Sequence, residues 1–256
     1  MLLNSTKQNG IYYVTEKKDI FSSVYITVRD KEQRIYDDHI VARLPKVLSN
    51  HKYYNEWKLR QKSTKRIVDY LTEKNTSLKI LDLGCGNGWF SNQLSKTPNS
   101  DIYAIDINHT ELEQAARVFQ SSNLKFIYAD IFSSETDNLQ DFDIITVNSC
   151  IQYFEDLEKI LSRLKSKLNS TGELHIIDSP FYKKSEITLA RNRTTTYYKN
   201  LGVPKMIHHY FHHEIEGLQG FEILYNPRKK IMDKLLRRED SPFMWLMFSN
   251  TIHNSN

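Results

Sequence analysis

The chain has few of the features that mark secreted, membrane-spanning or disulfide-bonded proteins. It has two cysteines in 256 residues, too few for a disulfide framework, which favours a reducing compartment. Its first residues, MLLNSTKQNG, lack the charged and apolar regions of a signal peptide. No apolar run approaches the length of a membrane span. These absences predict a cytoplasmic protein with no membrane partner.

A strong excess of one charge is also missing. Lys and Arg total 35 against 31 Asp and Glu, a net charge of +4. Nucleic-acid-binding domains usually carry a denser basic stripe, so this balance argues against a nucleic-acid partner without excluding an anionic ligand. Nothing in the sequence specifies the oligomeric state.

What the sequence does contain, from residue 78 onward, is an alternation of short apolar runs with helical patterns. The expected strands are LKILDL (78–83), DIYAID (101–106), LKFIYA (124–129), FDIITV (142–147) and ELHIID (173–178). Helical periodicity lies between them at 109–122 and 154–168. This alternation predicts an α/β fold, in which a doubly wound and mostly parallel sheet is covered on both faces. Ligands bind such sheets at the carboxyl ends of the strands.

The segments on either side of this core are expected to be additions to it. Residues 1–50 are predicted to be an ordered N-terminal extension, with a strand or hairpin in SSVYITVRDKEQRIY (22–36) because Val24, Ile26 and Val28 alternate. A helix is expected at 51–74. A long insertion follows the strand at 173–178, and insertions of this length often form lids. Beyond it we expect a strand FEILY (221–225), a basic helix at 228–238 and a closing strand FMWLMF (243–248).

The stretch ILDLGCGNGWF is the most informative motif. The chain has eight glycines, and three of them, Gly84, Gly86 and Gly88, follow a buried strand and precede a helix. Glycines in such a turn allow positive φ and a close approach of the backbone to a ligand. The dinucleotide fingerprint G-x-G-x-x-G would need glycine at position 89, which is Trp89 here. The spacing therefore disfavours a nicotinamide dehydrogenase.

Two acids stand at the ends of the next two strands. Asp106 lies where a carboxylate can accept hydrogen bonds from both ribose hydroxyls of a nucleoside. Asp130 is placed to accept a hydrogen bond from an exocyclic amine such as that of adenine, with a turn or helix-capping aspartate as the alternative.

With this set of residues the chain resembles the class I S-adenosylmethionine-dependent methyltransferases over about residues 78–178. The resemblance implies a seven-stranded sheet of order 3-2-1-4-5-7-6 whose last strand is antiparallel. It also implies S-adenosylmethionine as the cofactor and S-adenosylhomocysteine as its product. The implied cofactor residues are Asp82, Gly84, Cys85, Gly86, Gly88, Asp106, Ile107, Asp130, Ile131 and Asn148, with Arg60 as a candidate partner of the cofactor carboxylate.

In this family the segment after the fourth strand indicates the class of acceptor. Methyltransferases of bases or glutamine carry an acid or Asn followed by Pro-Pro and an aromatic residue there, whereas this chain reads VNSCIQYF. That difference favours a small-molecule acceptor, methylated more readily at oxygen than at nitrogen. Gln152 and Tyr153 would then point toward the acceptor, with helix capping and core packing as the alternative.

The insertion after the fifth strand contains HHYFHH (208–213), which holds four of the nine histidines. His208 and His212, and likewise His209 and His213, are spaced as helical neighbours. A histidine can act as a general base near neutral pH. A zinc site competes, but no H-E-x-x-H or paired-cysteine motif is present, so no metal is expected. The catalytic candidates are His208, His209, His212 and Tyr153, and the acceptor candidates are Gln152, Tyr153, Tyr182, Tyr197, Tyr198, Tyr210 and His213. For the histidines, plain packing or a place on the surface is the alternative.

Together these observations predict one class I methyltransferase domain at 51–256, with residues 179–220 as a substrate lid and 1–50 as an extension that does not fold alone. An RNA methyltransferase and a non-catalytic module that only binds S-adenosylmethionine are the alternatives.

Overall fold

The fold is built around one mostly parallel β-sheet. The structure is a computed structural model that describes residues 5–17, 20–227 and 240–253. In these ranges the sheet has nine strands in the order β1-β2-β5-β4-β3-β6-β7-β11-β10. The strands are β1 (Thr6–Gln8), β2 (Ile11–Tyr13), β3 (Leu78–Leu83), β4 (Ser100–Asp106), β5 (Leu124–Tyr128), β6 (Phe142–Asn148), β7 (Leu168–Ile177), β10 (Glu222–Tyr225) and β11 (Trp245–Ser249).

Seven of these strands have the order expected from the sequence. Across the sheet, the strands from β5 to β10 lie in the order β5-β4-β3-β6-β7-β11-β10. If these seven strands are numbered 1 to 7 along the chain, their order is 3-2-1-4-5-7-6. The pairs within β5, β4, β3, β6 and β7 are parallel, and β11 runs antiparallel to both β7 and β10. The prediction of a doubly wound sheet with an antiparallel final strand is therefore confirmed.

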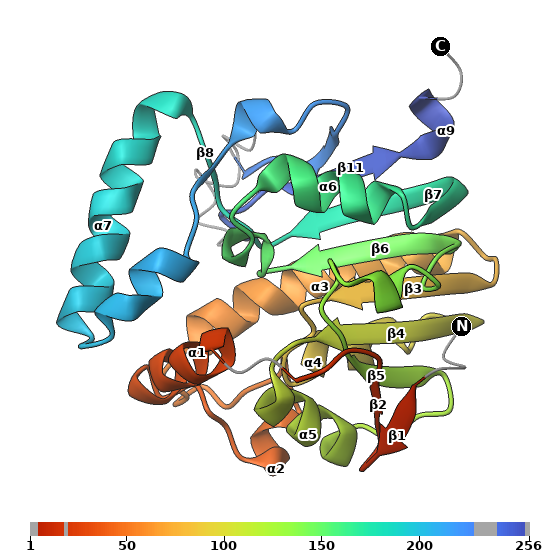
Figure 1. Cartoon of the computed structure of the whole chain (residues 1–256), viewed down its shortest axis with the longest axis horizontal. Coiled ribbons are helices and arrows are strands. Elements are labelled where there is room, and N and C mark those ends of the chain that lie inside the picture. Colours follow the sequence, from red (N-terminus) through yellow and green to blue (C-terminus); the bar gives the residue numbers. More distant parts are fainter. Residues whose placement is uncertain (1–4, 18–19, 228–239, 254–256) are drawn as a thin grey trace.

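Helices cover both faces of the sheet because its strands are apolar on both faces. On one face lie α3 (Tyr54–Glu73), α4 (Trp89–Leu94) and α5 (His109–Val118), whose buried side chains share one core cluster with alternate strand residues. On the other face lies α6 (Leu157–Lys165), in a second cluster. The ribbon shows this layering (Figure 1). In the part of the chain that the structure describes, no helix is long and apolar enough to cross a bilayer.

The N-terminal extension differs from the prediction. The segment expected to be a strand or hairpin forms helix α1 (Ile20–Lys31). Alternating Val24, Ile26 and Val28 suggested a strand, but Val28 is buried and packs with Val24 and Tyr25 against Tyr198, as helical spacing requires. A hairpin does occur earlier, where β1 pairs with β2, and β2 adds to the sheet beside β5. A short helix, α2 (Asp38–Val41), follows α1.

Several element boundaries also differ. The helices expected at 109–122 and 154–168 are shorter, at His109–Val118 and Leu157–Lys165. The strand expected at 173–178 begins earlier, because β7 runs from Leu168 and has a register irregularity against β6 between Phe142 and Ile144. The strands expected at 221–225 and 243–248 are present as β10 and β11. The basic helix expected at 228–238 lies outside the described residues.

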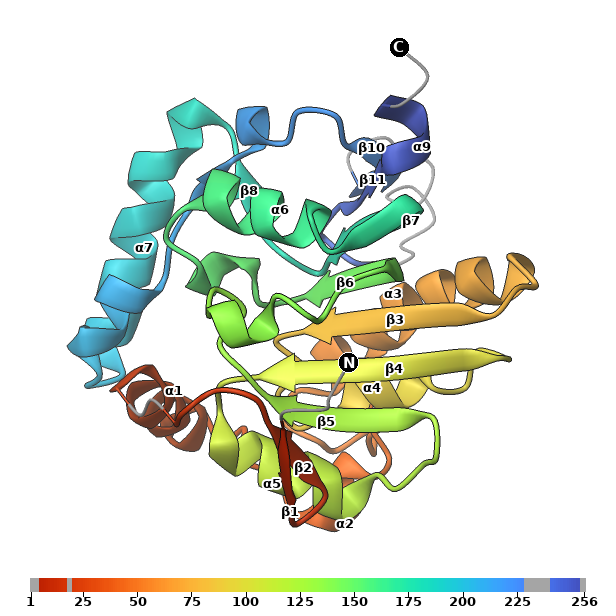
Figure 2. The ribbon, with the colours of Figure 1, turned by 45° about the vertical axis from the view of Figure 1, so that its right-hand side comes forward.

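The insertion after β7 stands beyond the carboxyl ends of the strands. It contains β8 (Phe181–Tyr182), η3 (Lys184–Glu186), α7 (Ile187–Asn200), η4 (Pro204–His209), β9 (His213–Glu214) and η5 (Ile215–Gly217). Both ribbon views place α7 and α1 off the same edge of the sheet (Figures 1 and 2). A third apolar cluster joins them, with Val28 of α1 against Tyr198, Val203 and Met206. The N-terminal extension and the insertion thus form one roof over this edge.

Candidate functional site

The loop between β3 and α4 has a backbone that only glycine tolerates. Gly84, Gly86 and Gly88 have φ values of 73°, 53° and 77°. A Cβ on Gly84 would come within 2.5 Å of Cys150 Sγ, and one on Gly86 within 2.7 Å of Glu111 Oε2. Gly88 is equally enclosed, since its Cβ would meet Phe126 and Ala115 at 2.7 and 2.8 Å. The glycines therefore let the loop lie close to its neighbours and leave its outer side open to a ligand.

Asp82 anchors this loop from below. Its carboxylate accepts hydrogen bonds from Ser91 Oγ (2.5 Å) and Thr146 Oγ1 (2.8 Å), which ties β3 to α4 and β6. Burial raises the pKa of Asp82 to about 7, although these hydrogen bonds act in the opposite direction. The geometry gives Asp82 a structural role in holding the loop, in addition to its place in the cavity wall.

Asp106 lies at the end of β4, facing the loop. One carboxylate oxygen accepts from Gly86 N and the other from Asn108 N, both at 2.7 Å. Burial raises its pKa in spite of these bonds. Next to it, Asn108 Nδ2 is buried and has no hydrogen-bond partner in the described structure. A hydroxyl-bearing ligand above Asp106 would supply an acceptor there, which is a property that the ribose of the expected cofactor has.

Asp130, Ile107 and Ile131 lie along the same wall. All three line the cavity described below. Asp130 Oδ1 accepts a hydrogen bond from Phe132 N at 3.0 Å, so the carboxylate also stabilises its own turn. The two interpretations given by the sequence, adenine contact and turn aspartate, are therefore compatible.

One cavity of about 1060 Å³ joins these residues to the roof. Ligand pockets usually measure about 300–1,000 Å³, so this one has room for a cofactor and a second molecule. Of the cofactor residues implied by the resemblance, Gly88 alone is absent from its wall, which contains Asp82, Gly84, Cys85, Gly86, Asp106, Ile107, Asp130, Ile131, Asn148 and Arg60.

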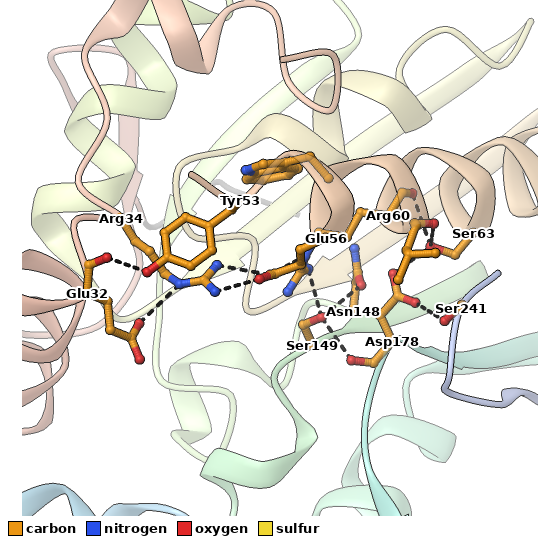
Figure 3. A network of polar contacts seen from close by, with 12 residues as sticks. Glu32, Arg34, Tyr53, Glu56, Arg60, Ser63, Asn148, Ser149, Asp178 and Ser241 are labelled. Carbon is orange, nitrogen blue, oxygen red and sulfur yellow. Dashed lines mark hydrogen bonds and ion pairs between the residues drawn. The ribbon is translucent and has the colours of Figure 1, made fainter. Parts of the chain in front are cut away.

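A network of hydrogen bonds and ion pairs runs along one wall of this cavity, from the segment after α1 to the segment after β7. Arg34 donates to both carboxylate oxygens of Glu56, at 2.9 and 2.5 Å, and Arg60 Nε donates to Glu56 at 3.1 Å. Burial would raise the pKa of Glu56, but the two arginines outweigh it and lower the pKa to about 2. Figure 3 shows both guanidinium groups turned toward this carboxylate. Arg60 Nη1 also donates to Ser149 Oγ at 3.0 Å, which holds Arg60 beside the end of β6.

Ser149 and Asp178 follow β6 and β7, and both have left-handed backbones, with φ of 56° and 49°. Ser149 Oγ donates to the carbonyl oxygen of Asp178 at 3.0 Å, while the Asp178 carboxylate accepts from Ser63 and Ser241 at 2.6 and 2.9 Å (Figure 3). Strained backbones outside glycine concentrate at functional sites, because the surrounding contacts must hold them. Through these hydrogen bonds, Asp178 connects α3, the segment after β6 and the segment before β11 beside the cavity.

The roof and the segment after β6 supply another part of the cavity wall. Of the acceptor candidates predicted from sequence, all but His213 line it: Gln152, Tyr153, Tyr182, Tyr197, Tyr198 and Tyr210. Gln152 lies in η2 (Ile151–Tyr153); its Nε2 donates to Ser149 O at 2.7 Å, and its buried Oε1 has no partner among the described residues. Burial raises the pKa of Tyr153, so its hydroxyl stays protonated and can donate.

The four histidines at 208–213 do not form helical pairs. Pro204 starts the short 3-10 helix η4, which ends at His209, and the chain is extended by His213. His209 lines the cavity and packs edge-on against Phe21 at 5.6 Å, whereas His208 is exposed. The helical pairing expected from the sequence is thus wrong, because 3-10 and extended backbones separate residues that an α-helix would align.

The other two histidines hold the insertion after β7, His212 to its own helix α7 and His213 to the segment after β6. His212 Nε2 is 2.8 Å from Thr194 Oγ1, and buried His213 is 3.1 Å from Ile151 O. Burial lowers the pKa of both imidazoles, so they are neutral near pH 7. Within the described ranges, no three His, Cys, Asp or Glu side chains meet as metal ligands would.

Among the cavity-wall residues that the sequence analysis missed are Phe21, Tyr25, Arg29 and Glu111. The first three are spaced by four residues on α1, so helical periodicity in 21–29 was the signal that would have revealed them. Glu111 lies beside Gly86, and burial raises its pKa to about 7. An acid in the first turn of a helix is common, so no sequence signal distinguished it.

Comparison with known proteins agrees with this geometry. A family model described as "Methyltransferase domain" matches residues 74–236. The chain is 34% identical over 128 residues to malonyl-[acyl-carrier protein] O-methyltransferase of Acetivibrio thermocellus, covering 49% of this chain and 44% of that protein. The protein of the same name from Halalkalibacterium halodurans is 31% identical over 135 residues, or 49% of this chain and 50% of that one. The chain thus spans about half the length of these relatives.

Solved structures have the same fold at low sequence identity. Magnesium protoporphyrin IX methyltransferase from Synechocystis PCC 6803, solved with bound S-adenosylhomocysteine, matches with a TM-score of 0.57 and 15% identity over 90% of this chain and 95% of that one. An O-methyltransferase family protein from Burkholderia thailandensis matches at 0.52 and 14%, over 89% and 70%. The sheet order, the glycine loop and the matching family model lead to one conclusion: the chain belongs to the class I S-adenosylmethionine-dependent methyltransferases.

Proposed function

We propose that this protein transfers a methyl group from S-adenosylmethionine to an oxygen atom of a small molecule. The observation that carries the proposal is the single cavity that contains both the glycine loop with Asp106 and the aromatic roof. The absence of a Pro-Pro motif after Asn148, and the curated relatives named O-methyltransferases, support oxygen over nitrogen.

Bound in this cavity, S-adenosylmethionine would supply a methyl group activated by a sulfonium, for in-line displacement in which the C–S bond breaks and its electron pair stays on sulfur. Asp106 and Asp130 are proposed to hold the nucleoside, and Arg60 the carboxylate of the methionine part. The chain then needs to align the acceptor, exclude water and take up the proton of an acceptor hydroxyl.

His209 is the proposed proton acceptor. It is the one histidine of 208–213 in the cavity wall, where it packs against Phe21. Tyr153 cannot take up the proton, because burial raises its pKa and keeps its hydroxyl protonated, so we assign it hydrogen-bond donation to the acceptor. His209→Asn should lower kcat, with S-adenosylhomocysteine affinity unchanged.

Thermal melting with S-adenosylhomocysteine and with NAD in parallel tests the cofactor assignment. A ligand at about 100 times its Kd stabilises the fold by roughly 2.7 kcal/mol. For a chain of this size, that raises the melting temperature by roughly 5–10 °C. A shift with S-adenosylhomocysteine alone supports the proposal, and a shift with NAD alone would replace it with a dehydrogenase.

Turnover separates the remaining alternatives. Release of S-adenosylhomocysteine with small hydroxyl-bearing acceptors is the expected result. Activity only on RNA, with a salt-sensitive gel shift, would favour an RNA methyltransferase. Tight cofactor binding with no turnover on any acceptor class would indicate a binding module.

A further inference from the structure

Four arginines of the described chain line the cavity, and they differ in the hydrogen bonds that their side chains make to acidic residues. Arg34 and Arg60 both donate hydrogen bonds to Glu56 (Figure 3). Arg193, on α7, is exposed at the rim. Arg29, on α1, lies inside, and none of its side-chain nitrogens forms a hydrogen bond within the described structure; its Nε is buried without a partner. Arg29 therefore has no hydrogen-bonded acceptor, and its ion pair with Glu32 is long.

The acids near Arg29 do not satisfy it. Glu32 is 3.9 Å away, beyond hydrogen-bond distance, and is itself engaged with Arg34 at 3.3 Å and with Tyr197. Glu111 is close enough to influence Arg29 electrostatically but makes no hydrogen bond to it, and burial keeps its carboxyl partly protonated near pH 7, with a pKa of about 7. The Nε of Arg29 is a buried N–H donor of a cation without an acceptor, which favours an anionic partner.

The space in front of Arg29 is aromatic. Its guanidinium lies 5.8 Å from the Tyr25 ring, which in turn packs against Tyr153 at 5.6 Å. The Tyr153 ring packs against the Tyr210 ring, and the Tyr210 ring against the Tyr198 ring, each pair with centroids 6.0 Å apart. These rings, from α1, η2 and the insertion after β7, form a chamber suited to a flat apolar molecule.

Hydroxyl groups add neutral donors to this chamber. Within the described residues, the hydroxyls of Tyr25, Tyr198 and Tyr210 make no hydrogen bond, although all three side chains line the cavity. Burial raises the pKa of each of them, so they remain protonated and able to donate. A guanidinium with tyrosine hydroxyls beside it offers several donors, which match the lone pairs of a carboxylate.

We propose that the acceptor of this enzyme is an aromatic carboxylic acid whose carboxylate is held by Arg29 within the tyrosine-lined chamber. This inference rests on the proposed methyltransferase function and narrows its acceptor to one chemical class. Arg29 would fix the orientation of the acid, while the aromatic rings of the chamber hold its plane.

The test uses the full-length protein saturated with S-adenosylhomocysteine, and matched pairs of ligands that differ only in charge. Suitable pairs are salicylate with salicylamide, 4-hydroxybenzoate with 4-hydroxybenzamide, and indole-3-acetate with indole-3-acetamide, measured by isothermal titration. We expect the acids to bind more tightly than their amides by about 10- to 100-fold, the usual size of a charge-assisted hydrogen bond. If no acid in the panel binds better than its amide, the proposal is wrong.

Variants assign the preference to Arg29. Arg29→Gln should remove the preference for the acid, Arg29→Lys should retain part of it, and Arg43→Gln, which changes an exposed arginine outside the cavity, should leave it intact. Unliganded melting curves show whether each variant folds. A preference that survives in Arg29→Gln contradicts the proposal.

Two outcomes separate this inference from the proposed function. If the wild-type protein fails to bind S-adenosylhomocysteine at all, the methyltransferase assignment itself fails. If Arg29→Gln mainly weakens S-adenosylhomocysteine binding, then Arg29 belongs to the cofactor site, and the acid-anchor proposal is overturned while the methyltransferase assignment stands.

Discussion

Acidic side chains behave in opposite ways in two regions of this sheet. In the glycine-loop region, burial raises the pKa of Asp82 and of Glu111 to about 7. On β7, burial would also raise the pKa of Glu173, but hydrogen bonds from His175 and Lys74 outweigh it and lower the pKa to about 2. Both regions bury carboxylates, so the difference lies in the donors that surround them.

The cluster around Glu173 is complete. Glu173 accepts from Lys74 (2.7 Å), Tyr70 (3.0 Å) and His175 (3.1 Å), and the other ring nitrogen of His175 accepts from Trp245 Nε1 (3.1 Å). Each group in this cluster has its partner within the protein, so the cluster joins α3, β7 and β11 and has no need of a ligand.

The glycine-loop region is incomplete by comparison. Asn108 Nδ2 and Arg29 Nε are buried without partners in the described structure. Asp106 has two backbone donors, and yet its pKa stays raised. A ligand with acceptors for the two N–H groups and a donor for Asp106 would satisfy this region, whereas the Glu173 cluster has its partners within the protein.

The largest expected effect comes from Asp106→Ala, which should remove cofactor affinity, with a smaller loss of stability because Gly86 N and Asn108 N lose their acceptor. Loss of two charge-assisted hydrogen bonds to the ribose should raise the Kd for S-adenosylhomocysteine by at least about 100-fold. Asp101→Ala is the matched control, since Asp101 lies on the same strand but is exposed beside Lys125. Isothermal titration measures both, and equal Kd values for the two variants would contradict the site.

Glu173→Ala should have the reverse effect, lowering stability while leaving cofactor affinity unchanged. It leaves the buried His175 and its neighbours without an acceptor, and breaking such a cluster costs roughly 3 kcal/mol. For this chain length, the melting temperature should fall by roughly 6–12 °C. Glu173→Gln keeps the shape and should cost less. A variant that weakens S-adenosylhomocysteine binding more than it lowers stability would show that the two regions are not independent.

The sequence indicated the position and the backbone of the glycine loop, whereas nothing in it indicated the Glu173 cluster. Continuous apolar strands, a G-x-G-x-G loop and acids at two strand ends are local patterns, so residues 78–178 could be interpreted directly. Glu173, His175, Tyr70 and Trp245 are brought together only by the sheet order and by α3 packing, and no local spacing indicates that.

The roof shows a different limit. In α1 the alternation of Val24, Ile26 and Val28 coincides with a helical face of Phe21, Tyr25 and Arg29, and tertiary packing against Tyr198 selected the helix. Pro204 and the 3-10 turn then separated the histidines that an α-helical interpretation had paired.

Asp82→Asn should be more stable than the wild type at alkaline pH. The pKa of Asp82 is raised to about 7 in the folded protein, so the fold favours the protonated carboxyl. This contribution to the free energy of unfolding is complete below the usual pKa of an aspartate and is lost as the pH rises through about 7. The amide cannot ionise, and it can still accept from Thr146 and donate to Ser91. We expect a gain of about 2 kcal/mol at high pH, which shrinks as the pH falls toward 4.

Urea unfolding across this pH range measures the difference between Asp82→Asn and the wild type. Glu173→Gln is the comparison in which the pH dependence has the opposite sign. Ionised Glu173 stabilises the fold above its usual pKa, and this stabilisation is lost as the pH falls toward 2. A stability difference for Asp82→Asn that does not change with pH would contradict the raised pKa.

The smallest expected effect on stability concerns the contact between α1 and α7. The Tyr197 hydroxyl donates to Glu32, and Tyr197 is 47% exposed, so Tyr197→Phe should change the free energy of unfolding by no more than about 0.5 kcal/mol. Val28→Ala is the matched change in the apolar part of the same contact, and it should cost about 1–2 kcal/mol because Val28 is buried against Tyr198. If α1 and α7 close the cavity together, both variants should raise the acceptor KM while the Kd for S-adenosylhomocysteine stays the same. An unchanged acceptor KM in Val28→Ala, despite its lower stability, would mean that the roof stabilises the fold without helping to hold the acceptor.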